Sequence, residues 1–86
     1  MKTFPLTVST PDGDRLRKEA ICLSVRGTEG ELAVMAGHVP FVTAVRPCTC
    51  KIELADETVI KGQTDGGILT VSRDGVTLLT GSFITE

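Results

Sequence analysis

Short apolar runs separated by turn residues constrain the fold of this chain more than any other feature. Apolar and polar side chains alternate over residues 2–9, and turn signals such as Pro11-Asp12-Gly13 return every ~8–12 residues. Alternation with a period of two places every second side chain on the same face of an extended strand. No segment carries a helical period of useful length. The pattern predicts an all-β domain in which two packed antiparallel sheets enclose an aliphatic core.

Several segments have the length and composition of strands. Their approximate ranges are 2–9, 14–18, 20–26, 32–35, 41–45, 48–54, 58–61, 68–72, 76–80 and 83–84. In the segment 20–26, one face is predicted to carry Ile21, Leu23 and Val25. The segment 48–54 has the cleanest alternation, and one of its faces is predicted to carry Cys48, Cys50, Ile52 and Leu54. Asp-Gly steps before the segments 68–72 and 76–80 favour hairpins at those places.

The stretch Gly30–Pro47 places a sharp corner between two of these apolar runs. The corner consists of Ala36-Gly37-His38-Val39-Pro40. Gly37 can adopt backbone angles that a β-carbon would penalise, while Pro40 fixes its own φ and favours an extended residue before it. The corner therefore presents a single imidazole between two strands. His38 is either a structural histidine bonded to its own corner or a histidine presented to a protein partner.

Size and charge exclude several classes of function. With 86 residues, the chain has room for one domain, residues 1–86, which buries only roughly 60–65% of its unfolded surface. A net charge of −2 offers no basic field for nucleic acid. No apolar run approaches the ~20 residues that cross a bilayer, and the N-terminus lacks the apolar core of a signal peptide. We therefore expect a small cytosolic domain that gains stability by docking on a larger partner.

The sequence carries little chemistry for catalysis or cofactor binding. Cys48 and Cys50 stand on one strand face rather than in the tight loop that structural zinc sites use, and an odd number of cysteines fits a reducing compartment. His38 has no nucleophile or carboxylate beside it in the sequence. Gly66-Gly67 lacks the Lys-Ser/Thr of a phosphate loop and is interpreted as a turn with a close backbone approach. We predict no catalytic residue, no metal and no cofactor. The competing hypothesis is a small metal-dependent protein with the ligands Cys22, Cys48, Cys50 and His38.

Several motifs resemble the N-terminal domain of the epsilon subunit of rotary ATP synthases, which is called delta in mitochondria. The most specific match is Gly30-Glu31-Leu32 followed by Gly37-His38-x-Pro40 and by Thr43–Pro47, TAVRP. The likeness covers nearly the whole chain and includes the segments 4–13, 24–26, 66–71 and 75–79. This chain departs from the family where it has Ala36 in place of a frequent Pro, and Ala33 and Cys48 in place of a usual Gly. The family's usual C-terminal helical hairpin, which inhibits ATP hydrolysis in many members and binds ATP in some, would begin just after Glu86, so its roles are not expected here.

The resemblance implies a ten-stranded antiparallel β-sandwich of two packed sheets. It also implies a non-catalytic rotor subunit of the central stalk, which docks on the gamma subunit and on the polar loops of the c-ring and couples ion translocation to ATP synthesis. The chain would then lie peripherally at the cytoplasmic face of a bacterial inner membrane. Glu31 matches the acidic residue that faces the c-ring loops, and His38 matches the histidine of the rotor-facing corner. The residues expected to contact partners are Glu31, Gly37, His38 and Pro40. The alternative is a free-standing β-sandwich adaptor that uses the same fold for another protein partner.

Overall fold

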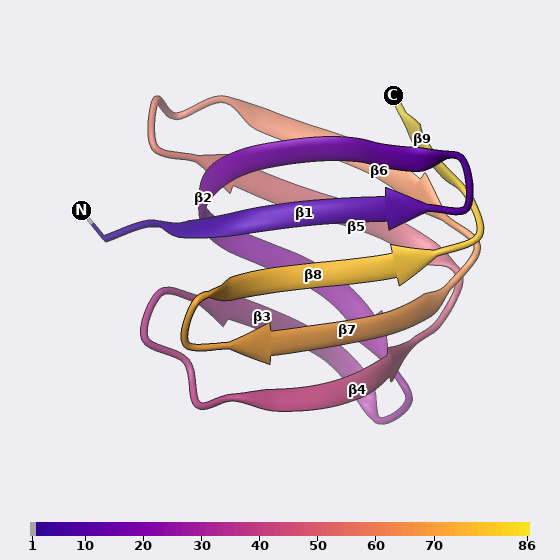
Figure 1. The fold of residues 1–86 in the computed structure, drawn as a ribbon, viewed down its shortest axis with the longest axis horizontal. Coiled ribbons are helices and arrows are strands. Elements are labelled where there is room, and N and C mark those ends of the chain that lie inside the picture. The colour runs from indigo at the N-terminus through magenta and orange to yellow at the C-terminus, as the bar shows by residue number, and fades with distance from the viewer. Residues whose placement is uncertain (1) are drawn as a thin grey trace.

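The structure, a computed structural model, describes residues 2–86, and strands are their only regular secondary structure (Figure 1). The strands are β1 Phe4–Thr10, β2 Gly13–Gly27, β3 Gly30–Met35, β4 Phe41–Val45, β5 Cys48–Leu54, β6 Val59–Thr64, β7 Gly67–Ser72, β8 Gly75–Thr80 and β9 Phe83–Thr85. The predicted all-β sandwich is confirmed. No helix that could cross a membrane is found among residues 2–86.

The longest strand, β2, joins the two layers of the sandwich. Its first half pairs with β1, and its second half pairs with β3 and β5. In Figure 1 the nearer layer contains β1, β8, β7, β4 and the first half of β2, while the farther layer contains β3, β5, β6, β9 and the second half of β2. Nine strands therefore make two layers of five, because β2, with 15 residues, is counted in both. Residues 2–86 thus form nine strands, and the predicted count of ten is reached only when the two halves of β2 are counted separately.

The register of β2 shifts between Ala20 and Cys22, and this shift decides which side chains point inward. Ala20 and Leu23 are both fully buried although they are three residues apart, whereas Ile21 is only half-buried. The prediction that Ile21 shares a face with Leu23 and Val25 is therefore wrong. An extra residue in a strand increases its local bend and twist. Here it lets β2 pass from one layer to the other.

One strand pairing departs from the antiparallel prediction. β1 runs parallel to β8, with Leu6 opposite Val76 and Val8 opposite Leu78. The other pairings are antiparallel. Parallel neighbours require a crossover connection rather than a tight turn, and here all the strands from β2 to β7 lie between them. A side-chain pattern that alternates along one strand is identical for both directions, so it could not reveal this pairing.

The core lies between the layers and is aliphatic, as the alternating pattern predicts. Its largest fully buried side chains include Leu6, Leu23, Ile52, Leu69 and Leu78. Along β5, Cys50 and Ile52 are buried and Cys48 and Leu54 are half-buried, so the predicted face of this strand is confirmed. A β-carbon on Gly67 would clash with the carbonyl oxygen of Leu79, which confirms the close backbone approach expected there.

Ile52 tests the core and the register of β5, because it is fully buried and lies opposite Leu23 of β2 and Ile60 of β6. We expect Ile52→Ala to lower the free energy of unfolding by about 2–5 kcal/mol, since it leaves a cavity between packed strands. Urea denaturation followed by circular dichroism measures the loss. The matched control is Val42→Ala at a position that is 66% exposed, with an expected change within about 0.5 kcal/mol. Equal effects of the two substitutions would contradict the register.

The three cysteines are free and differ in burial, since Cys50 is fully buried while Cys22 and Cys48 are half-buried. Burial, together with a smaller effect of neighbouring Cys48, raises the pKa of the Cys50 thiol to about 12. Burial also raises the pKa of Cys22. Because the thiolate is the reactive form, we expect iodoacetamide to modify Cys48 first and to leave Cys50 unmodified in the folded protein. Peptide mass mapping over a time course checks this order, and urea-unfolded protein, in which all three should react, is the control.

Candidate partner-binding site

The corner between β3 and β4 is fixed by its own backbone. Gly37 has a φ of +86°, a left-handed conformation that favours glycine. The backbone N–H of His38 donates a hydrogen bond of 3.1 Å to the carbonyl of Met35, which closes the turn after β3. The local sequence therefore produces the sharp corner that its glycine and proline predict.

The imidazole of His38 is held by this corner and remains exposed. Its Nδ1 lies 2.9 Å from the carbonyl oxygen of Val39, and its ring centroid lies 5.0 Å from that of Phe41 at an interplanar angle of 48°. Because a carbonyl oxygen only accepts, Nδ1 carries the hydrogen, and Nε2 of the neutral ring is left as an acceptor. The ring is thus bonded to its own corner and is still accessible to another molecule, so its presentation to a partner stays a prediction.

A cavity of about 410 Å³ lies beside the corner, between residues 3–5, 35–40, 71–73 and 75–76. Its lining includes three core side chains, Phe4, Val71 and Val76, that are only 3–6% exposed. The layers separate here because β3 pairs with β2 and has no pairing with β4. The cavity therefore reaches the edge of the hydrophobic core at the His38 end.

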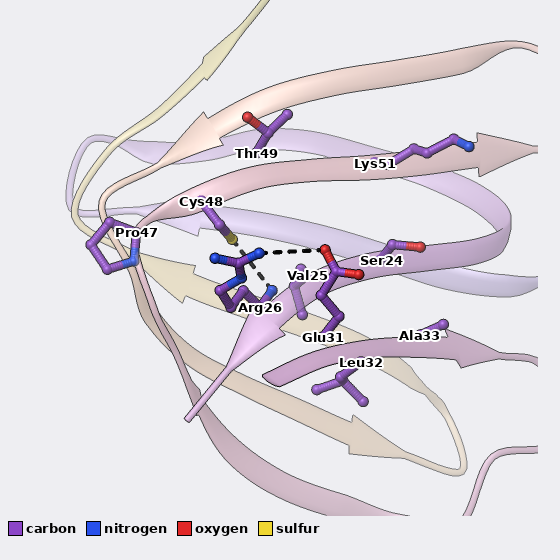
Figure 2. A pocket seen from close by; sticks show the side chains of 10 residues that line it. All are labelled: Ser24, Val25, Arg26, Glu31, Leu32, Ala33, Pro47, Cys48, Thr49 and Lys51. Carbon is purple, nitrogen blue, oxygen red and sulfur yellow. Dashed lines mark hydrogen bonds and ion pairs between the residues drawn. The ribbon is translucent and has the colours of Figure 1, made fainter. Parts of the chain in front are cut away.

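Glu31 lies at the opposite end of β3 from this corner. At ~3.3 Å per residue, the four residue steps from Glu31 to Met35 span roughly 13 Å. The carboxylate of Glu31 is 83% exposed and lies 3.6 Å from the guanidinium of Arg26, its partner across the β2–β3 pair (Figure 2). Glu31 and His38 are close in the sequence, but an extended strand separates them. The structure does not bring them together in one site.

A second cavity, of about 620 Å³, adjoins Glu31. Figure 2 shows that its charged groups come from three adjacent strands, Arg26 from β2, Glu31 from β3 and Lys51 from β5. The backbone N–H of Arg26 donates to the sulfur of Cys48 at 3.4 Å. Charges of both signs stand side by side here. A polar partner that offers both signs of charge can form ion pairs with this surface. Ion pairs of this kind fix the orientation of a complex more than they add affinity.

The outer face of β4, β7, β8 and β1 carries only uncharged side chains, and we call it the uncharged face. In one row across these strands, Ala44, Ile68, Leu79 and Ser9 lie side by side, and in the next row lie Val42, Thr70, Thr77 and Thr7. Val42, Ile68 and Leu79 are 66%, 44% and 52% exposed. Exposed apolar groups that gather on one face mark an interaction surface.

Sequence reasoning did not identify the uncharged face. The signal was present, because the outward positions of these strands carry Val, Ile, Leu, Ala or Thr where the segment 14–18 carries charges. It became visible only when strand pairing placed those positions beside one another.

The residues of the zinc hypothesis do not form one metal site. Cys22 lies on β2 opposite Met35 of β3 and Glu53 of β5, Cys50 is fully buried in the core, and the His38 ring is exposed and bonded to the carbonyl of Val39. Within residues 2–86, no three side chains of the His, Cys, Asp or Glu type are grouped so that they could hold a metal ion.

Comparison with known proteins finds relatives of this chain. Curated relatives named ATP synthase epsilon chain, from Bacillus thuringiensis (strain Al Hakam) and Bacillus anthracis (strain CDC 684 / NRRL 3495), are each 34% identical over 82 residues. The matched region covers 95% of this chain and 61% of either relative, so the chain spans about three fifths of their length.

Solved structures share the fold. A chain in the cryo-EM structure of the Euglena gracilis mitochondrial ATP synthase superimposes with a TM-score of 0.91 at 24% identity, covering 96% of this chain and 53% of that one. A chain in the central stalk and c-ring structure of the Tetrahymena thermophila mitochondrial ATP synthase has a TM-score of 0.79 at 14% identity, with coverages of 96% and 66%. Residues 3–86 match the family described as ATP synthase, Delta/Epsilon chain, beta-sandwich domain, and the chain belongs to this family.

Proposed function

We propose that this domain is a non-catalytic part of the rotor of a rotary ATP synthase, where it docks on the gamma subunit and on the polar loops of the c-ring. In this position it helps to couple ion translocation to ATP synthesis at the cytoplasmic face of a bacterial inner membrane. The observation that carries the proposal is the family match over residues 3–86. The two contrasting surfaces of the sandwich support it, because a connector between two partners needs two distinct interfaces.

The gamma subunit is assigned to the uncharged face and the adjoining His38 corner. Covering the apolar groups of this face is favourable and removes no charge from water, and the partner must supply hydrogen bonds to the hydroxyl groups that it buries. Val42 on β4 belongs to the uncharged face and is only four residues after His38, so a partner that covers the face also reaches the corner. Gly37 and Pro40 serve this contact by holding the imidazole in one position.

The polar loops of the c-ring are assigned to the Glu31 end. The carboxylate of Glu31 is held by Arg26 at the surface and is 83% exposed, so a cation from a loop can approach it without further rearrangement. The Glu31 end and the His38 corner lie at opposite ends of β3. One rigid sandwich can therefore contact both partners at once.

Binding of the gamma subunit encoded with this chain tests the first assignment. We expect a dissociation constant in the micromolar range or tighter by calorimetry, and a loss of about five- to tenfold in His38→Ala, because a contact at the centre of an interface carries a large share of its energy. Glu31→Ala is the control and should leave gamma binding unchanged. Circular dichroism should show cooperative unfolding in both variants. Loss of that cooperativity in His38→Ala would assign the histidine a structural role instead, and a folded chain that does not bind gamma would favour the adaptor alternative.

The second assignment is tested with c-rings in nanodiscs and the preformed complex of this chain with gamma. We expect Glu31→Ala to weaken ring binding about three- to tenfold, and we expect added salt to weaken wild-type binding more than that of the variant, because exposed charge pairs are screened. Glu19→Ala, which removes an exposed carboxylate of the first half of β2, is the matched control. Equal ring binding by wild type and Glu31→Ala would refute the role of Glu31.

A further inference from the structure

The cavity beside the His38 corner has the chemistry of a socket for a single side chain. We propose that the gamma subunit inserts there an aromatic side chain with a hydrogen-bond donor at its tip, a tyrosine or a tryptophan. This inference rests on the proposed function, because it specifies what the gamma subunit places in the site assigned to it.

The apolar lining of the cavity favours an inserted side chain that is mostly apolar. Phe4, Val71 and Val76 belong to the core and are almost fully buried, and Ala36 and Pro40 of the corner add apolar groups at the sides. The volume of about 410 Å³ lies within the range of about 300–1,000 Å³ that is typical of pockets. An aromatic ring that enters here extends the hydrophobic core to the surface, and aromatic side chains carry the largest burial energy of all.

The tautomer of His38 selects a donor at the tip of that ring. Nδ1 donates to the carbonyl of Val39, and the contact with Phe41 restricts the plane of the imidazole. The remaining nitrogen, Nε2, accepts a hydrogen bond in the neutral ring. The hydroxyl of tyrosine and the indole N–H of tryptophan can donate to it, whereas phenylalanine, leucine and an ionised carboxylate cannot.

Arg73 disfavours a lysine or an arginine as the inserted residue. It lines the same cavity, and no ion pair within residues 2–86 involves it. Its guanidinium repels another cation but is attracted by the face of an aromatic ring. The apolar lining, the hydrogen-bond acceptor of His38 and the cation of Arg73 therefore all favour an aromatic side chain that carries a hydrogen-bond donor.

Calorimetry with the gamma subunit and three variants tests the socket. Ala36→Leu fills the cavity and should weaken binding by about tenfold or more, as expected for a blocked anchor. His38→Phe keeps a ring on Phe41 but removes the acceptor, and it should weaken binding about three- to tenfold. His38→Gln restores a hydrogen-bond acceptor and should lose less affinity for gamma than His38→Phe. The matched control is Ala33→Leu, which adds the same atoms to an exposed alanine on β3 outside the cavity and should bind like wild type. Thermal unfolding verifies that all variants are folded.

A double-mutant cycle identifies the inserted residue. Each tyrosine of gamma is changed to phenylalanine and each tryptophan to phenylalanine, and one of these changes should weaken wild-type binding but add nothing in the His38→Phe background. No coupling at any of these positions would overturn the proposal. Wild-type affinity in both Ala36→Leu and His38→Phe would overturn it too, while the proposed function would stand. Failure of the wild-type chain to bind gamma would instead reject the proposed function.

Discussion

The continuous pairing of β2 across both layers is the constraint on which the rest of the structure depends. Its first half is bonded to β1 and its second half to β3 and β5, with a register shift at Ala20–Cys22 where it bends. Because one strand carries backbone hydrogen bonds in both layers, neither layer can slide independently. Within residues 2–86, β3 pairs only with β2, so β2 sets the positions of both Glu31 and the His38 corner.

One end of the sandwich is closed by side-chain hydrogen bonds, and the other end is not. At one end the hydroxyl of Thr80 on β8 lies 2.6 Å from that of Thr64 on β6, and it donates to the carboxylate of Asp65 at 2.9 Å. The same carboxylate accepts from the backbone N–H of Ser82 at 3.1 Å, so hydrogen bonds tie the layers together. At the His38 end no such bridge joins β3 to β4, and the core opens into a cavity. One end is sealed by polar groups, whereas the other contains a cavity.

The two proposed interfaces rely on different physics. The uncharged face can provide affinity, because exposed Val42, Ile68 and Leu79 leave water when they are covered. The Glu31 end can provide orientation, because its ion pair with Arg26 is exposed and screened and therefore contributes little binding energy. This division suits the proposed role, in which the domain turns with one partner while it rests on another.

The sequence by itself determined the local features of this protein. The alternation in Cys48–Leu54 and the corner at Gly37 and Pro40 depend on neighbouring residues, whose backbone preferences act over short distances. The resemblance to the family could also be recognised from the sequence, because it rests on motifs along nearly the whole chain. Only the tertiary structure decided the half-buried position of Ile21, the parallel pairing of β1 with β8, the uncharged face, and the separation of Glu31 from His38. These features depend on which distant strands pair and in which register, and an alternating pattern is compatible with many such pairings.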